Sequence, residues 1–350
     1  MRPVTVRIMH QEPGPDAGPL TRWLIAERET IARQHVDRFV AAGAADVAIV
    51  AGPPDVTPFG SRLRALASAD RPDGLVVLGS GAIPLATRRD IRDFVEAAAT
   101  GGRRALANNR FSADAVAIAD AWPTLANLPD LPTDNGLPRW LAEHAGYRVT
   151  DLGRRWRLAV DIDGPLDLLL IGRSRVADAA EAGGVDMGPA TAVIEAVRRV
   201  AADPSAELLV AGRTSATTLG WLERSTASRT RALIEERGLR TSTAHQRSPA
   251  SVIGALLDRD GPSSLGEHLV RLGDAAVVDT RVLMAHRWGA NETAWPVAED
   301  RFSSDLLLPG QISDPWLREL TVAARAAPIP ILLGGHSLVG PGVRLVVRSP

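Results

Sequence analysis

The sequence predicts a three-layer α/β fold in which a mostly parallel sheet is covered by helices on both faces. Short runs of apolar residues, such as DVAIV at 46–50 and LVVL at 75–78, are typical of strands buried on both faces. Between them lie longer segments with apolar residues three and four positions apart, which is the spacing of amphipathic helices. This alternation is the pattern of α/β domains, and 350 residues are enough for two of them.

The first half of the chain contains the clearest elements. Its expected strands are Val4–Met9, Asp46–Val50, Leu75–Leu78, Ala105–Asn108 and Ala115–Ile118. Helices are expected over Leu20–Ala42 and over Asp90–Ala99, where Thr87 can serve as the N-cap. Functional groups in such sheets gather at the carboxyl ends of strands, and the GSGAIP loop at 79–84 and Asp161 are both expected at such ends.

The second half repeats the same alternation. Its expected strands are Glu207–Ala211, Ala275–Val278 and Pro330–Leu333, and its expected helices are Pro189–Ala202, one opening at Ser215–Trp221, and Arg229–Glu236. A change to Ala-, Gly- and Asp-rich sequence at 173–188 suggests a domain boundary. The predicted domains are therefore residues 1–175 and a C-terminal α/β domain of residues 176–350, whose role the sequence does not indicate.

Composition excludes several classes of chemistry. Cysteine is absent, which excludes disulfides, thiolate metal sites and a cysteine nucleophile. The 40 basic residues are all arginine, so a lysine Schiff base and a P-loop lysine are excluded as well. Any phosphate must then be held by arginine, backbone amides or a metal ion. Because the net charge is −1, we expect neither a nucleic-acid partner nor an anionic membrane partner.

The N-terminal sequence does not have the pattern of a signal peptide. Its short apolar run is flanked by charges on both sides and followed by prolines. No uncharged apolar stretch reaches about 18 residues, the length needed for a membrane span. We therefore expect a cytoplasmic protein without a membrane segment.

The segment DIDGPLDL at 161–168 carries the most informative carboxylates. On an extended backbone the side chains of Asp161 and Asp163 point to the same side, so both could ligate one Mg²⁺ or Mn²⁺ ion. The alternative is a turn in which Gly164–Pro165 redirects the chain and Asp167 caps the next helix. The spacing by itself leaves both interpretations open.

DIDGPLDL resembles the DIDTPEDL segment of small nucleotidyltransferases such as the molybdenum-cofactor and 2-phospholactate guanylyltransferases. The upstream order is also similar to that family, with a long helix, the strand DVAIV, and then LVVLGSGAIPLATRRDIRDFV where the family has a strand, a Gly-Asp-x-Pro-Leu loop and a helix. The resemblance covers about residues 1–175. It implies a glycosyltransferase-A-type fold, a nucleotide over the strand ends near Ser80 and Gly81, and magnesium held by the aspartate segment.

Two parts of the family pattern are absent from this sequence. The family opens with a Gly-rich loop carrying Arg or Lys that wraps the triphosphate. Here residues 10–20 are HQEPGPDAGPL, in which three prolines withhold amide donors. The GSGAIP loop also lacks the family's metal-binding aspartate. These departures leave open whether the chemistry is retained, changed or lost.

The motif NNRFSAD at 108–114 is a second candidate for substrate binding. Asn108 and Asn109 offer donors and acceptors to a base or sugar, Arg110 suits a phosphate, and Asp114 could supply a missing carboxylate. The alternative is an ordinary polar turn between two strands.

Polar residues also follow the expected strands of the second half. The secondary candidates for an anion or metal site are Asp279, Arg281, His286, Asp305 and His336. Arg–Asp pairs that hold loops together explain most of them equally well. Residues 212–215, GRTS, could hold a phosphate at a helix N-terminus or form a simple Ser/Thr cap.

Three functional hypotheses follow from the sequence. The first is a nucleotidyltransferase-like or nucleotide-sugar transferase enzyme, in which Asp161 and Asp163 are catalytic metal ligands and the partner is a nucleotide or nucleotide sugar. The second is a non-catalytic descendant that keeps the ligand pocket. The third is a phosphate-ester enzyme with its site in residues 176–350.

Overall fold

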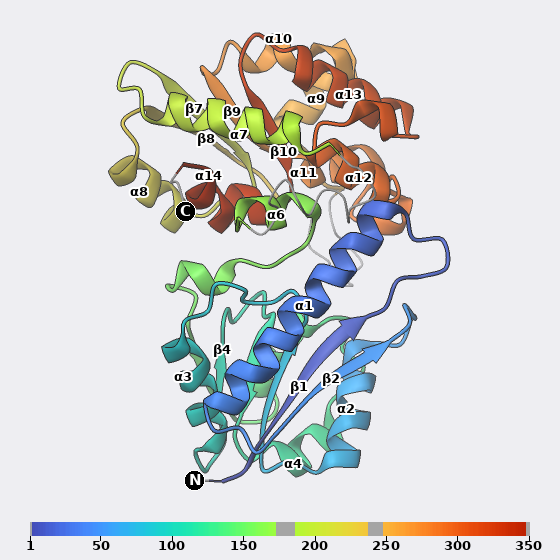
Figure 1. The fold of residues 1–350 in the computed structure, drawn as a ribbon, viewed down its shortest axis with the longest axis vertical. Helices are drawn as coiled ribbons and strands as arrows, with labels where there is room; N and C mark the ends of the chain where they lie inside the picture. The colour runs from blue at the N-terminus through green and yellow to red at the C-terminus, as the bar shows by residue number, and fades with distance from the viewer. Residues whose placement is uncertain (1, 173–185, 237–247, 348–350) are drawn as a thin grey trace. The chain divides into compact units, whose positions relative to one another are not determined.

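The computed structural model describes residues 2–172, 186–236 and 248–347, and the chain forms two compact units (Figure 1). The N-terminal unit comprises residues 1–17 and 24–162, and the C-terminal unit comprises residues 18–23 and 163–350. Most of the predicted boundary segment, residues 173–185, lies outside the described residues. No described helix has the length and apolar character needed to cross a membrane.

The N-terminal unit contains a six-stranded, mostly parallel sheet in the order β2-β1-β3-β5-β4-β6. Its strands are β1 (Val4–Gln11), β2 (Asp46–Gly52), β3 (Gly74–Gly79), β4 (Arg104–Ala107), β5 (Ala115–Ile118) and β6 (Arg148–Asp151). Strand β5 runs antiparallel to both of its neighbours, β3 and β4. The five strands predicted for this half are confirmed, and β6 was missed because its exposed sequence, RVTD, contains no apolar run.

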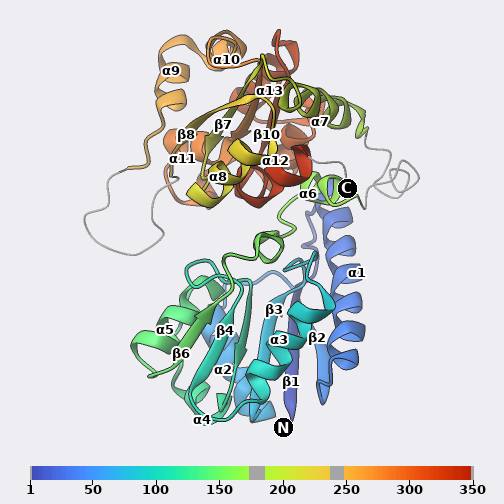
Figure 2. The same ribbon diagram turned by 90° about the vertical axis from the view of Figure 1, so that its left-hand side faces the viewer.

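Helices cover both faces of this sheet (Figure 2). They are α1 (Pro19–Ala41), α2 (Phe59–Asp70), α3 (Arg88–Ala99), α4 (Ala121–Thr124) and α5 (Leu137–Glu143). Alternate side chains of β3 show the layers, since Val76 and Leu78 pack with α1 and α3 while Leu75 and Val77 pack with α2 and α5. An uninterrupted apolar strand therefore has a core on each side, as the sequence predicts.

Helix α3 begins with the predicted N-cap. Thr87 Oγ1 accepts a hydrogen bond from Asp90 N (3.2 Å), and Asp90 Oδ2 accepts one from Thr87 N (2.8 Å), which together form a capping box. Arg155 adds an ion pair to Asp90 at 2.8 Å. Burial opposes the charge of Asp90, but the hydrogen bonds from Thr87 and the ion pair with Arg155 outweigh it and lower the pKa of the carboxyl.

The C-terminal unit contains a four-stranded, fully parallel sheet in the order β10-β9-β7-β8. Its strands are β7 (Glu207–Gly212), β8 (Arg229–Ile234), β9 (Ala275–Asp279) and β10 (Ile331–Gly334). Its helices are α6 (Pro165–Leu170), α7 (Gly188–Ala201), α8 (Ala216–Ser225), α9 (Val252–Asp260), α10 (Leu265–Leu269), α11 (Thr280–Trp288), α12 (Ala298–Asp305), α13 (Pro315–Ala326) and α14 (Val343–Val347). Helices α9, α10, α11 and α13 pack on one face of the sheet, and α7 packs on β7, β9 and β10.

The prediction of a helix over Arg229–Glu236 is wrong, because Arg229–Ile234 forms the edge strand β8. The strand pairs in parallel with β7 from Glu207↔Arg229 to Gly212↔Ile234. A short segment of mixed polarity fits either periodicity, and here the unpaired edge of β7 supplies hydrogen bonds that an isolated helical turn does not have.

Candidate functional site

The N-terminal sheet reverses its strand order between β1 and β3, because β1 has β2 on its other side. Loops that leave the carboxyl ends of such a pair diverge, and ligands of open α/β sheets usually bind between them. The register pairs Met9 with Gly79 and so places His10 beside Ser80. His10 Nδ1 and Ser80 Oγ are 3.1 Å apart, and both side chains are buried. Burial lowers the pKa of His10, so its imidazole is neutral at pH 7.

The loop after β3 meets the aspartate segment at this edge. Gly81 O accepts a hydrogen bond from Ile162 N (3.2 Å), and Ala82 forms an isolated β-bridge with Asp161. A Cβ at Gly81 would lie 3.0 Å from Ile162 O and 3.2 Å from Asp161 Oδ1, so this approach favours glycine. Arg28 Nε donates to Ile162 O (2.6 Å). The two segments that carry the family resemblance therefore lie side by side.

The expectation that Asp161 follows a strand is wrong. Residues Trp156–Ala159 form a 3₁₀ turn, in which Leu158 N donates to Arg155 O. Leu158 is buried in the core beneath α1 and α3, and the turn is what brings it there. Asp161 consequently emerges from a turn and joins the sheet edge through its bridge to Ala82.

The two predicted metal ligands, Asp161 and Asp163, belong to different compact units. Asp161 Oδ1 accepts a hydrogen bond from Ile162 N (2.9 Å), and Asp163 Oδ2 accepts one from Ser337 Oγ (3.4 Å). Within the described ranges, no group of three or more His, Cys, Asp or Glu side chains is placed to hold a metal ion. The described residues by themselves therefore do not build a magnesium site, which needs further oxygen ligands from water or substrate phosphates.

Asn108 of the NNRFSAD motif closes its own loop. Its Oδ1 accepts hydrogen bonds from Asp114 N (3.0 Å) and Ala115 N (3.1 Å), and its Nδ2 donates to Asp114 Oδ2 (3.0 Å) and Leu158 O (2.9 Å). These four bonds use the whole capacity of the amide, and the side chain is buried. The structure gives Asn108 a structural role at the end of β4.

The next two residues of the motif differ from Asn108. Asn109 Oδ1 accepts from Phe111 N (2.9 Å) and Ser112 N (3.3 Å), which is an Asx turn. The Nε of Arg110 is buried and makes no hydrogen bond with any described residue. Of this motif, Arg110 therefore retains the clearest donor for a ligand.

The first turn of α1 is capped by a carboxylate that the sequence analysis did not single out. Within the C-terminal unit, Glu299 accepts hydrogen bonds from Leu20 N (2.9 Å), Thr21 N (3.1 Å) and Thr21 Oγ1 (2.9 Å). A Cβ at Gly18 would lie 2.3 Å from the Glu299 carboxyl carbon, so glycine admits the carboxylate. The amides of Leu20 and Thr21 are therefore already bonded within the protein.

The C-terminal sheet also reverses its strand order, here between β7 and β9. The register pairs Ala211 with Val278, which brings the turn after β7 next to Asp279. Gly212 adopts φ = 127°, and a Cβ there would lie 2.3 Å from Asp279 Cβ. This close approach of the two strand ends therefore needs glycine.

Two arginine–aspartate pairs occupy this edge. Arg213 holds Asp279 through Nε (2.6 Å) and Nη2 (3.1 Å), and Arg281 holds Asp305 through Nη1 (2.5 Å) and Nη2 (2.6 Å). The side chains of Asp279 and Asp305 are 0% and 3% exposed. Burial opposes the charge of Arg281, but Asp305 overcomes this and raises the pKa of the guanidinium. Both are two-pronged ion pairs of the kind that fix a guanidinium in one orientation.

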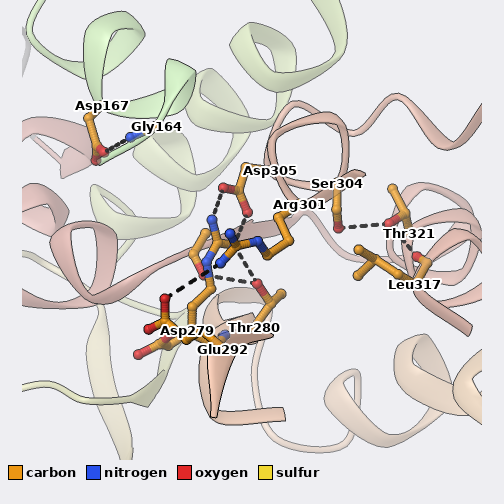
Figure 3. A network of polar contacts seen from close by, with 12 residues as sticks. Gly164, Asp167, Asp279, Thr280, Glu292, Arg301, Ser304, Asp305, Leu317 and Thr321 are labelled. Atoms are coloured by element: carbon orange, nitrogen blue, oxygen red, sulfur yellow. Dashed lines mark hydrogen bonds and ion pairs between the residues drawn. The ribbon is translucent and has the colours of Figure 1, made fainter. Parts of the chain in front are cut away.

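Further polar groups join this edge (Figure 3). Thr280 Oγ1 donates to Gly334 O (3.1 Å) and accepts from Arg281 Nη1 (2.9 Å). Arg301 lies 3.9 Å from Glu292, and its buried Nε has no hydrogen-bond partner in the described part of the chain. Burial and the nearby Arg281 lower the pKa of Arg301. The sequence places Arg301 in the charged segment 299–305, but no local pattern distinguishes it from the other arginines of the chain.

Asp167 caps α6 from the second half of DIDGPLDL, as the alternative interpretation predicts. Its Oδ2 accepts hydrogen bonds from Asp163 N (2.9 Å) and Gly164 N (2.8 Å). Burial, followed by the nearby charge of Asp163, raises the pKa of Asp167 well above its usual range.

His336 and His286 have different surroundings although both were predicted for one site. His336 Nδ1 lies 2.9 Å from Arg213 O, at the edge that holds the two ion pairs. His286 Nδ1 accepts from Ser251 N (3.0 Å), and its Nε2 bonds Asp258 (2.9 Å). His286 therefore ties α11 to α9, whereas Asp279, Arg281, Asp305 and His336 gather at the sheet edge.

The chain matches no known protein-family model, and no curated protein is similar to it in sequence.

Proposed function

We propose that the N-terminal unit binds a nucleotide or nucleotide sugar at the carboxyl edge of its sheet, and that the protein is a nucleotidyltransferase-like or nucleotide-sugar transferase protein. The observation that carries the proposal is the meeting of the GSGAIP loop with Asp161 at the point where the strand order reverses. The resemblance of the DIDGPLDL motif, the strand order and the glycine-dependent approach at Gly81 support the same place. The glycosyltransferase-A-type fold is part of this proposal.

The proposed site offers neutral hydrogen-bonding groups and one arginine. Ser80 and His10 can contact a base or sugar, and Arg28 lies close enough to Gly81 to neutralise a phosphate. Transfer would proceed by attack of an acceptor oxygen on the α-phosphorus with loss of diphosphate, or by glycosyl transfer from a nucleotide sugar. The protein's share of such a reaction is positioning and charge neutralisation.

Any Mg²⁺ or Mn²⁺ in this proposal enters with the substrate. The described residues present Asp161 at the loop, and we assign it to the cation carried by the nucleotide phosphates.

Thermal shift and calorimetric titration test the proposal with GTP, CTP, ATP, UTP and nucleotide sugars, each with and without Mg²⁺ or Mn²⁺. A ligand at a hundred times its Kd stabilises the folded protein by about 2.7 kcal/mol, which is a shift of a few degrees at this size. Asp161→Asn should remove the metal-dependent part of the shift. Asp73→Asn is the matched control, because Asp73 is exposed and precedes β3 at the opposite end of the strand.

The outcomes separate the two forms of the proposal. Binding with release of diphosphate or transfer of a sugar supports an enzyme. Binding that depends on Asp161 without turnover supports the non-catalytic descendant. No shift with any member of the panel, or equal loss in both aspartate variants, overturns the assignment of this edge.

A further inference from the structure

We propose that the carboxyl edge of the C-terminal sheet binds a phosphate group that carries a proton, with Arg213 and the first amides of α8 donating to its charged oxygens and His336 accepting its O–H. The site lies where the strand order reverses between β7 and β9, outside the unit to which the nucleotide is assigned. The proposal therefore stands independently of the nucleotide site.

His336 is oriented as a hydrogen-bond acceptor. A carbonyl oxygen can only accept, so the 2.9 Å contact with Arg213 O requires a proton on Nδ1 of His336. The neutral ring then presents an unprotonated Nε2, and the side chain is exposed to solvent. Its surroundings keep it neutral, since enclosing protein atoms and then the charge of Arg213 lower the pKa of His336.

Arg213 is anchored with one donor group to spare. Asp279 takes hydrogen bonds from Nε and Nη2, whereas Nη1 makes none with any residue in the described ranges. Asp279 is in turn fixed by Arg281 N (3.1 Å). A guanidinium held in this way is oriented before a ligand arrives, which reduces the entropy lost on binding.

Helix α8 begins at Ala216, three residues after Arg213. Ser215 caps it by accepting from Thr218 N (3.2 Å), and the exposed amides of Ala216 and Thr217 have no acceptor among the described residues. The helix has ten residues, so its N-terminus carries a partial positive charge. In the same turn, Thr214 is 9% exposed and its Oγ1 has no hydrogen-bond partner within the described structure. This turn holds a buried hydroxyl that a bound anion or its hydration could satisfy.

Because His336 Nε2 is an acceptor among donors, the proposed site should prefer an anion that carries a proton. Hydrogen phosphate has charged oxygens for the donors and one O–H for His336 Nε2, whereas sulfate at neutral pH has no proton to offer. Sulfate would therefore set an oxygen lone pair against that of Nε2, leaving the nitrogen unsatisfied. Phosphate should therefore bind more tightly than sulfate at pH 7.5.

Protonation should reverse this preference. When His336 takes up a proton on Nε2 it becomes a donor, so sulfate binding should strengthen as pH falls toward and through the lowered pKa of the ring. The charged groups that face the ring are Arg213 from the β7–α8 turn, Asp279 from the end of β9 and Asp163 from the segment before α6. A histidine with only a packing role would give no such exchange of preference.

Isothermal titration of the full chain with inorganic phosphate and with sodium sulfate at pH 7.5 and pH 5 tests the proposal. His336→Ala should abolish the preference for phosphate. Arg213→Lys should weaken the binding of both anions about tenfold, because lysine lacks the second bond to Asp279 and the remaining donor group. His144→Ala is the control, because His144 is exposed and belongs to the N-terminal unit. Methyl phosphate at pH 7.5 separates free phosphate, which keeps an O–H, from an ester dianion, which has none.

Each outcome decides for or against the site. Preference for phosphate that disappears in His336→Ala and declines as pH falls supports it, and the wild-type pH series provides this test even if the variant unfolds. Equal affinity for phosphate and sulfate at pH 7.5, or a preference that His336→Ala leaves unchanged, overturns it. Asp161→Asn should leave phosphate binding unaltered, so failure of the nucleotide proposal and failure of this one are distinguishable.

Discussion

The two sheets reverse strand order at equivalent points, yet their carboxyl edges contain opposite kinds of chemistry. At the N-terminal edge, neutral groups predominate, with His10 bonded to Ser80 and the amide of Asn108 fully hydrogen-bonded within its loop and to Leu158 O. At the C-terminal edge, buried charges predominate, with Arg213 on Asp279 and Arg281 on Asp305. Topology therefore sets where a ligand can approach, while the side chains at the strand ends set what it can be.

The difference has an energetic consequence. Removing one partner of a neutral hydrogen bond leaves an unsatisfied polar group, whereas removing the carboxylate of a buried ion pair leaves an uncompensated charge, which destabilises the fold more strongly. The C-terminal edge should therefore be the more sensitive of the two to single substitutions. Three predictions test this comparison.

The largest effect is expected for Asp305→Ala. Arg281 would lose both prongs of its ion pair in a buried setting, and the free energy of unfolding should fall by about 3–5 kcal/mol. Asp93→Ala is the matched control, because Asp93 pairs with Arg155 nearer the surface and should cost less than about 1 kcal/mol. Urea denaturation measures both, and equal losses would remove the contrast between buried and exposed pairs.

Asn108→Ala should give an intermediate loss, about 2–3 kcal/mol. The substitution leaves Asp114 N and Ala115 N without their acceptor at the end of a buried strand. Asn109→Ala, which opens a half-exposed Asx turn, should change stability by less than about 1 kcal/mol. Urea denaturation measures both variants. A larger loss of stability in Asn109→Ala than in Asn108→Ala would contradict the structural role of Asn108.

The smallest effect concerns Asp90 and Asp167, which occupy the same capping position in the two units. The pKa of Asp90 is lowered, so it stabilises the fold above pH 3.8 and this contribution is lost as pH falls through the lowered value. The pKa of Asp167 is raised, so stability falls as pH rises from 3.8 through the raised value. Asp90→Asn should lower the free energy of unfolding by about 1 kcal/mol at pH 7. Asp167→Asn keeps an acceptor oxygen, so its stability relative to the wild type should increase as the pH rises.

Unfolding temperatures measured between pH 4 and pH 7 check these opposite signs. Parallel pH profiles for the two asparagine variants would show that the surroundings of the two capping boxes do not differ as described. Diverging pH profiles would show that the same residue type, an aspartate that caps a helix, stabilises one unit and destabilises the other as the pH rises.

Local sequence pattern determined much of the fold. The apolar strands DVAIV and LVVL, the cap at Thr87 and the long helix after the proline-rich loop all follow from side-chain type and spacing within a few residues. Such features depend on interactions between near neighbours, so the sequence predicts them well. It failed at Arg229–Ile234, where pairing with a distant strand outweighs local preference, and at β6, which has no apolar run.

The candidate sites needed the tertiary structure. Sequence spacing singles out Asp161 and Asp163 but does not show what surrounds them: Asp161 follows the turn that buries Leu158 and bridges to Ala82, and Asp163 N donates to Asp167, which caps α6. The sequence likewise suggests one group formed by Asp279, Arg281, His286, Asp305 and His336. In the fold, His286 instead bonds Ser251 and Asp258 at α9. The sequence alone establishes which chemical groups exist and which short segments favour helix or strand. Which groups meet depends on strand order and register, set by contacts between residues far apart in the chain.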